Sequence, residues 1–366
     1  MGKDQDRRNT QLLEVLSRIP YRLKVVYNNI DMPNLLLTES CVRHCPYCFA
    51  KQYMENESNQ NTLTKENVLY VADFLKRSDF SSISLLGGEP LIHPQVSDYI
   101  DYLLNMDFYI TIFTSGIMPT SKYKSFVDRI LGLTEEYNNK LSFVVNVNEP
   151  RFSPKSELEK VYKFLSDLGD LCSLSFNIYR LDYNLDFLIE YILKYGLRRR
   201  VRFGIANPIP GVANEYIHPK DFKKVGSSLI KALESLYDHG IVPNLDCGFP
   251  LCMFDNEGIG KLYKYTNNSL SFHECGPTFD IGPDLSCWSC FPLSNVHKVS
   301  LKDFENYEAI YDYFDKIHQE YRKRIRGIYK ECDQCRNYNN SICSGGCLAH
   351  ILNRFHEEGS IRQINI

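Results

Sequence analysis

The chain has 366 residues, with 42 Lys and Arg against 45 Asp and Glu, which gives a net charge of −3 with histidine neutral. This balance excludes a polycationic binder, and 43% hydrophobic against 24% charged residues excludes an intrinsically disordered chain. The length predicts one large domain with a smaller one, because single hydrophobic cores stop growing near roughly 250–300 residues.

The lack of long apolar segments and the cysteine content predict the cellular compartment of the protein. No stretch approaches the roughly 20 apolar residues of a membrane span, and the charged start does not continue into a signal peptide. We therefore expect a cytoplasmic protein without a membrane partner. Thiols are kept reduced there, so the 13 cysteines favour bound metal over disulfides. No basic-aromatic pattern supports binding to nucleic acid.

Strand-like runs alternate with helical patterns through the first two thirds of the chain, which is typical of repeated βα units around a parallel sheet. The predicted strands are residues 34–38, 82–86, 109–113, 141–147, 173–179 and 200–206. Ser156, three residues before Glu159, predicts a capping box at a helix start, and Gly196 predicts a helix end.

Six βα units predict an α/β fold, a partial (β/α)6 relative of the eight-unit TIM barrel, whose chemistry lies at the carboxyl ends of the strands. We assign this barrel to residues 34–240, after an N-terminal extension of residues 1–33. The later chain has nine cysteines between Cys247 and Cys347 and little periodicity apart from a helix near residues 302–326. Residues 241–366 are therefore expected to form a cysteine-rich domain held by metal.

Three cysteines, Cys41, Cys45 and Cys48, follow the first predicted strand in the segment CVRHCPYC. A [4Fe–4S] cluster usually takes four thiolates, so three from one loop would leave one iron open to another ligand. A zinc site of the same three thiolates with His44 is the alternative.

The spacing of these cysteines resembles that of the radical S-adenosylmethionine (radical SAM) superfamily, C-x3-C-x2-C with an aromatic residue before the last cysteine, here Tyr47. The segment LLGGEP at the end of the second strand resembles the GGEP motif of that superfamily, with Gly87, Gly88 and Glu89. The resemblance implies that the three thiolates bind a catalytic [4Fe–4S] cluster. It also implies that the Gly-Gly-Glu segment binds the methionine moiety of S-adenosylmethionine, and that Tyr47 is one of the residues that bind this cofactor.

Two later strands carry polar residues that the resemblance assigns to the same cofactor. Asn146, on the fourth strand, would face the ribose. Asn177 and Arg180 lie at the end of the fifth strand, where the guanidinium could pair with the methionine carboxylate through a charge-assisted bond. Satisfied polar groups at a barrel mouth are the alternative for each.

The cysteines after residue 246 resemble the SPASM extension of radical SAM enzymes, which carries auxiliary [4Fe–4S] clusters. The match departs from the pattern twice, because Cys290 rather than Cys287 falls at the expected position and no cysteine follows Cys347. We expect Cys287 and Cys172 to be packed free thiols. Eight thiolates are then left for two clusters, namely Cys247, Cys252, Cys275, Cys290, Cys332, Cys335, Cys343 and Cys347.

The resemblance leaves the division of these thiolates partly open. Cys275, Cys290 and Cys347 are expected to share one cluster with either Cys247 or Cys252. The second cluster would take Cys332, Cys335 and Cys343. A single auxiliary cluster with spare thiols is the alternative.

The resemblance implies reductive cleavage of S-adenosylmethionine to a 5′-deoxyadenosyl radical that abstracts hydrogen from a substrate. Enzymes with this domain pair mostly cross-link, epimerise or oxidise ribosomally made peptides or proteins, so a peptide or protein substrate is expected. A radical dehydrogenase of sugars or aminocyclitols is the first alternative. A sulfatase-maturase-like, formylglycine-forming enzyme is the second, which is disfavoured because Phe291 stands where those enzymes tend to place an acidic residue.

Two non-enzymatic classes would also explain the cysteines. An iron–sulfur electron carrier or a zinc-scaffold binding protein would account for the thiols but not for the Gly-Gly-Glu segment or the six βα units.

A radical SAM enzyme needs an electron donor such as flavodoxin or ferredoxin. Because only 33 residues precede the first predicted strand, recognition of a peptide leader would need a separate protein or another surface.

Overall fold

The computed structural model describes residues 32–51, 61–137, 139–267 and 274–357, so most of the predicted N-terminal extension lies outside the described residues. Successive parallel strands form one sheet in chain order. They are β1 Asn34–Leu36, β2 Ser82–Leu86, β3 Tyr109–Thr114, β4 Leu141–Asn146, β5 Cys172–Ile178, β6 Arg200–Ile205 and β7 Val242–Leu245. All six predicted strands are present, which confirms the α/β fold and the partial barrel.

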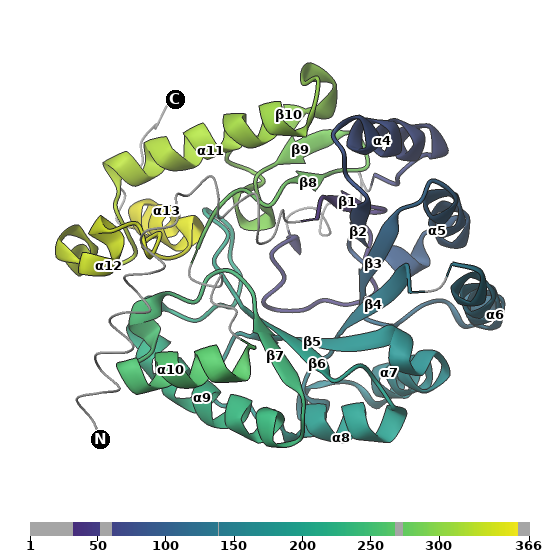
Figure 1. Ribbon diagram of the computed structural model, residues 1–366, viewed down its shortest axis with the longest axis horizontal. Coiled ribbons are helices and arrows are strands. Elements are labelled where there is room, and N and C mark those ends of the chain that lie inside the picture. Colours follow the sequence, from purple (N-terminus) through teal and green to yellow (C-terminus); the bar gives the residue numbers. More distant parts are fainter. Residues whose placement is uncertain (1–31, 52–60, 138, 268–273, 358–366) are drawn as a thin grey trace.

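Each pair of neighbouring strands is joined by a helix. These helices are α4 Lys65–Arg77, α5 Val96–Asn105, α6 Thr120–Glu136, α7 Lys155–Leu168, α8 Asp186–Tyr195 and α9 Phe222–Asp238. They form an arc around the outside of the curved sheet (Figure 1). The carboxyl ends of the strands therefore meet at one edge, where a barrel of this class carries its chemistry.

The chain after residue 240 extends both edges of the sheet, which the sequence did not predict. Strand β7 adds to β6, while β8 Asp280–Ile281 pairs in parallel with β1 and leads to the antiparallel strands β9 Ser286–Trp288 and β10 Val299–Ser300. Runs of two to four residues are too short to show a strand period. The domain division at residue 240 stays a prediction, and the sheet itself continues across it.

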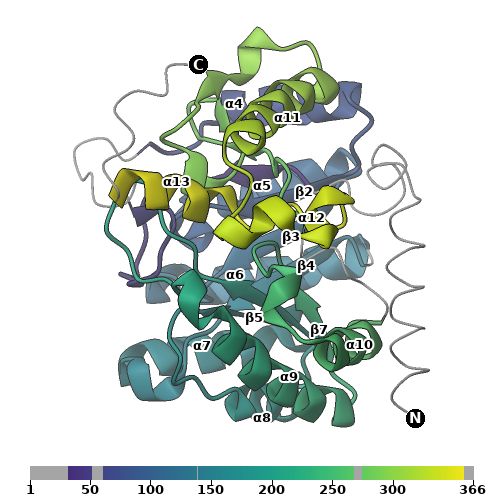
Figure 2. The ribbon, with the colours of Figure 1, turned by 90° about the vertical axis from the view of Figure 1, so that its left-hand side faces the viewer.

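The remaining helices lie on the side where the curved sheet is open. They are α10 Asn256–Tyr265, α11 Tyr307–Arg324, α12 Arg336–Asn339 and α13 Leu348–Glu357. Figure 2 looks onto that side and shows α12 and α13 between α11 above and the α9–α10 pair below. Contacts from α13 reach the start of α9, where the rings of His350 and Phe222 are 5.5 Å apart. No helix of the described residues is long and apolar enough to cross a membrane.

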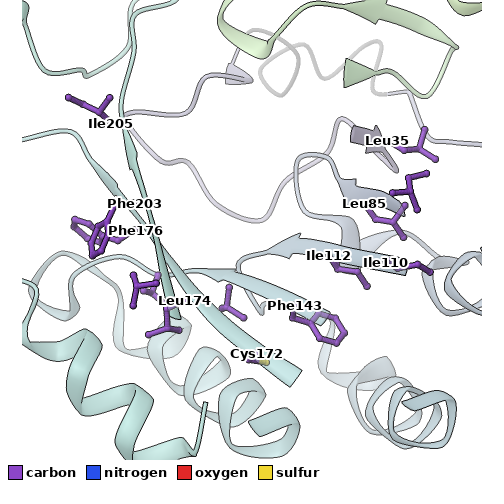
Figure 3. Close-up of a cluster of buried hydrophobic side chains, with 14 of the residues drawn as sticks. Leu35, Leu85, Ile110, Ile112, Phe143, Cys172, Leu174, Phe176, Phe203 and Ile205 are labelled. Atoms are coloured by element: carbon purple, nitrogen blue, oxygen red, sulfur yellow. The ribbon is translucent and has the colours of Figure 1, made fainter. Parts of the chain in front are cut away.

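The core lies between the sheet and its outer helices. Alternate residues of the strands are fully buried there, among them Leu35, Ile112, Phe143 and Leu174 (Figure 3). Cys172 belongs to this core and Cys287 is equally buried, as expected of packed thiols.

The positions that alternate with the core residues carry polar side chains, which therefore face the concave side of the sheet. They include Ser84, Thr111, Asn146, Ser175 and Arg202. The inner surface of the barrel is thus suited to hold a polar ligand.

Of the two helix boundaries predicted from the sequence, the structure contradicts one and confirms the other. The capping box was wrong, because α7 begins at Lys155 and places Ser156 inside its first turn, after Pro154, which makes no side-chain cap. Gly196 does end α8, in the left-handed conformation with φ 63°.

We expect Phe143→Ala to lower the free energy of unfolding by about 3–5 kcal/mol, because the ring is fully buried and packs edge-on against Phe164 at 5.5 Å. Leu131→Ala on α6, where the side chain is 40% exposed, is the control and should change it by less than about 0.5 kcal/mol. Thermal unfolding followed by circular dichroism would measure both. Equal shifts for the two variants would contradict this packing.

Candidate active site

The loop after β1, which we call the triad loop (residues 40–50), carries the thiols of Cys41, Cys45 and Cys48 near enough to one another for their charges to interact. Burial raises the pKa of Cys41 to about 11 and that of Cys48 to about 12, and it raises the pKa of Cys45 as well. The neighbouring thiols raise the values for Cys41 and Cys48 further. Burial alone therefore keeps these thiols protonated, and a bound metal would be needed to deprotonate them.

Gly87 and Gly88 hold the triad loop by backbone contact. The amide of Gly88 donates to the carbonyl of Thr38 at 2.8 Å, and that of Glu89 donates to the carbonyl of Ser40 at 2.9 Å. A Cβ on Gly88 would lie 2.1 Å from the oxygen of Ser40, and one on Gly87 would lie 2.5 Å from that of Thr38. The predicted Gly-Gly segment is therefore a packing surface for the cysteine loop.

The carboxylate of Glu89 is buried and fully hydrogen-bonded within the protein. One oxygen accepts from the hydroxyl of Thr114 and the amide of Leu91, and the other accepts from the amide and the hydroxyl of Ser115. These four donors use the acceptor sites of a carboxylate and join the ends of β2 and β3. Burial raises the pKa of Glu89, and the same hydrogen bonds oppose that shift. The contact with the methionine ammonium stays a prediction.

Arg43 is a second anchor of the triad loop, and the sequence analysis missed it. Its side chain is 5% exposed; Nε lies 3.0 Å from a carboxylate oxygen of Glu157 on α7, and Nη1 donates to the carbonyl of Asn146 at 2.9 Å. Its charge also lowers the pKa values of Cys41 and Cys45, in part offsetting the effect of burial. A lone arginine in a cysteine loop has no spacing signal, so only the fold reveals its partners.

Tyr47 joins the triad loop to the ends of β4 and β5. Its hydroxyl donates to Oδ1 of Asn148 at 2.5 Å and accepts from Nδ2 of Asn146 at 3.2 Å. Asn177 continues this network by donating to Oδ1 of Asn146 at 3.0 Å. Tyr47, Asn146 and Asn177 were each predicted for the cofactor site, and the structure brings them together.

Arg180 lies further out than these residues. Its guanidinium stacks on the rings of Tyr179, 5.1 Å away, and Phe152, 4.2 Å away, and Nε lies 3.4 Å from a carboxylate oxygen of Asp182. The ring of Tyr179 separates it from Tyr47, since those two rings are 4.6 Å apart. The contact of Arg180 with the cofactor carboxylate stays a prediction.

Four of the later cysteines form what we call the first auxiliary group, Cys247, Cys275, Cys290 and Cys347. The thiols of Cys275 and Cys347 are hydrogen-bonded to each other, which lowers the pKa of Cys275 and raises that of Cys347. Cys290 interacts with Cys275, and Cys247 interacts with Cys347. These interactions favour Cys247 over Cys252 as the fourth member, and the sharing of a cluster stays a prediction.

The second auxiliary group consists of Cys252, Cys332, Cys335 and Cys343, which line one cavity together with Leu251, Ile328 and Tyr338. Burial raises the pKa of Cys252 to about 12, and the other three thiols add to the shift. Two sets of four thiols match the expected number of ligands for two clusters, and their ligand roles stay a prediction. Among the described side chains, no group of three or more His, Cys, Asp and Glu is arranged to hold a metal ion.

Residues 35–203 match the sequence profile of the radical SAM superfamily, over the stretch that includes the three cysteines and Glu89. The chain carries a radical SAM domain. Members of this superfamily are enzymes, so the expectation of a radical SAM enzyme is confirmed. The match implies S-adenosylmethionine and one [4Fe–4S] cluster as the cofactors of this domain.

Curated relatives resemble only part of this radical SAM enzyme. Human molybdenum cofactor biosynthesis protein 1 is 36% identical over 83 residues, which cover 22% of this chain and 13% of that protein. An S-adenosylmethionine-dependent nucleotide dehydratase of Selenomonas ruminantium is 30% identical over 101 residues, 25% of this chain and 35% of that protein. The chain thus spans well under half of the length of these relatives.

Solved structures resemble nearly the whole chain. SuiB of Streptococcus suis bound to S-adenosylmethionine matches with a TM-score of 0.61 at 14% identity, over 89% of this chain and 75% of SuiB. The structure described as native anSMEcpe with bound AdoMet matches with a TM-score of 0.58 at 13% identity, over 89% and 95% of the two chains. This likeness shows the same fold, including the cysteine-rich region.

We expect Gly88→Ala to lose the iron bound at the triad loop, because the new methyl group would displace the backbone of Ser40. Gly132→Ala is the matched control, since nothing lies within 4 Å of a Cβ at that position on α6. Iron per chain after anaerobic reconstitution is the measurement. Full iron content in Gly88→Ala would contradict the packing role of the glycine.

A double-mutant cycle on Arg43 and Glu157 tests the second anchor. We expect Arg43→Ala and Glu157→Ala to show a coupling of about 0.5–3 kcal/mol in unfolding free energy, because the arginine is buried and the pair is in contact. Lys155 and Glu159, an exposed pair on the same helix 4.0 Å apart, are the control and should couple by less than about 0.5 kcal/mol. Equal coupling in both pairs would rule out a special role for Arg43.

Proposed function

We propose that this radical SAM enzyme modifies a peptide or protein substrate and holds two auxiliary [4Fe–4S] clusters besides the one at the triad loop. The likeness in fold over 89% of the chain to SuiB and anSMEcpe carries the proposal. Both proteins have been described in complex with peptides, SuiB with the precursor peptide SuiA and anSMEcpe with a peptide named Cp18Cys.

The residues of the triad loop have separate tasks in this proposal. Cys41, Cys45 and Cys48 would hold the cluster, and Gly88 and Arg43 would fix the loop that carries them. When bound, the cluster and S-adenosylmethionine supply one-electron reduction of the sulfonium and a hydrogen-abstracting radical. The chain itself positions the two and keeps the sulfurs buried.

The charge around the mouth of the barrel supports a peptide over a nucleoside polyphosphate. Four arginines, on the concave face of the sheet or in the loops after its strands, have carboxylate partners, in the pairs Arg43–Glu157, Arg151–Glu149, Arg180–Asp182 and Arg202–Asp246. A polyphosphate is normally bound by cations with unused charge. Because each of these four arginines is neutralised by a carboxylate, they attract a polyphosphate only weakly.

Exposed apolar side chains surround the same mouth. Val42 and Phe49 on the triad loop are 40% and 42% exposed, and Phe152 and Leu181 after β4 and β5 are 43% and 46% exposed. Large apolar side chains on a surface favour contact with another polypeptide. Together with the polar concave face of the sheet, they suit a peptide that offers both side chains and backbone groups.

The residue at position 291 weakens the formylglycine alternative. Phe291 is buried, and its ring packs at a tilt against Phe49 at 4.9 Å and edge-on against Trp288 at 5.6 Å. It contacts the triad loop through Phe49 and offers no base. As partners we propose a flavodoxin- or ferredoxin-type electron donor and, for leader recognition, a separate peptide-binding protein.

The proposal predicts that the reconstituted full chain releases 5′-deoxyadenosine from S-adenosylmethionine with dithionite, and that a low-mass peptide fraction from the source cells increases the release. Nucleoside triphosphates and an aminocyclitol, tested in parallel, should give no increase. Mass spectrometry should show a modified peptide. Stimulation by either small molecule, with no change in peptide mass, would overturn the substrate assignment.

Two variants check that the cleavage comes from the triad loop. Cys45→Ala should abolish release of 5′-deoxyadenosine. Cys172→Ala should keep this release, because the thiol lies on β5 in the hydrophobic core and belongs neither to the triad loop nor to the two auxiliary groups. Equal activity in both variants would show that the cleavage has another source.

A further inference from the structure

One buried histidine beside the first auxiliary group has no hydrogen-bond partner. His318 lies on α11 with 3% of its surface exposed, and neither ring nitrogen has a partner. Buried polar groups in native proteins are nearly always satisfied, so such a ring calls for a partner that is a cofactor, an ion or water.

One cysteine of the first auxiliary group, Cys275, lies beside His318. The ring interacts with the backbone and with the charge of Cys275, but its contact with that backbone does not reach the geometry of a full hydrogen bond at either ring nitrogen. One helical turn later, the guanidinium of Arg322 donates to the carbonyls of Ser344 and Gly346, directly before Cys347. This face of α11 thus holds the loops of two cysteines of the group.

Two other buried histidines, His93 and His350, differ from His318 in the hydrogen bonding of the ring or in its neighbours. His93 is hydrogen-bonded through both ring nitrogens, to the carbonyl of Leu63 at 3.0 Å and to the amide of Gln95 at 3.1 Å. His350 also has an unpaired Nε2, but its ring packs between the rings of Tyr216 and Phe222. His318 alone among these three combines two unpaired nitrogens with a neighbouring cysteine of an auxiliary group.

We propose that His318 donates a hydrogen bond to a sulfur of the cluster held by Cys247, Cys275, Cys290 and Cys347. This inference rests on the auxiliary clusters of the proposed function and adds a residue that sets the properties of one of them. An imidazole carries at least one N–H in either protonation state. A donor to a cluster sulfur stabilises the more negative, reduced form and so raises the reduction potential.

The test compares His318→Phe, which keeps a ring but removes the donor, with His318→Gln, which keeps an N–H. His350→Phe is the control for loss of a buried histidine. Iron per chain and redox titration followed by electron paramagnetic resonance are measured on the reconstituted full chain. We expect all three variants to keep the iron content of the wild type.

His318→Phe should shift one auxiliary cluster to a more negative potential, by about a tenfold change in its reduction equilibrium or about 59 mV for one electron. His318→Gln should retain most of the wild-type potential, and His350→Phe should retain all of it. If His318→Phe does not fold, as judged by circular dichroism, His318→Met replaces it with the same expected shift.

An unchanged potential in a fully iron-loaded His318→Phe would overturn the proposal. Loss of about four irons in both His318 variants would overturn it too, because the histidine would then be a ligand rather than a donor. Failure of the proposed auxiliary clusters would look different, since the wild type itself would then bind iron only at the triad loop.

Discussion

The close backbone contact between Gly88 and Ser40 is the constraint on which the site depends. With no Cβ at position 88, the triad loop lies directly on the end of β2, and the amide of Glu89 bonds to the same loop. The carboxylate of Glu89 then ties this point to β3. Arg43 and Tyr47 connect the other side of the loop to β4 and α7. Contacts to three strands therefore hold the loop that carries the three thiols.

The curved sheet does not close on itself, so its two edges need another link, which the later cysteines could supply. Cys247 and Cys252 follow β7 at one edge of the sheet, whereas Cys275 and Cys290 flank β8 and β9 at the other edge. The first auxiliary group takes cysteines from both sides. A cluster bound there would link the two edges of the sheet as well as transfer electrons. It would also stabilise the fold, because metal binding to grouped thiolates contributes directly to folding.

The sequence predicted those parts of the molecule that local patterns encode. The six strands follow from periodicity and the cysteine triad from fixed spacing. The Gly-Gly segment was predicted as part of a cofactor site, whereas its contact with the triad loop appears only in the fold. Strands β7 to β10 are too short for such a pattern. Arg43 and Glu157 are 114 positions apart, and His318 meets Cys275 only through the packing of α11. The place of Cys247 and Cys252 likewise depends on how the chain returns after β7.

Iron and acid-labile sulfide per chain, measured on the wild type and on a Cys41/Cys45/Cys48→Ala variant after anaerobic reconstitution, test the separation of the three sulfur groups most directly. We expect about twelve irons in the wild type and about eight in the variant, since the two auxiliary groups do not use the triad loop. A fall from about eight to about four would contradict two auxiliary clusters, and no fall at all would contradict a cluster at the triad loop.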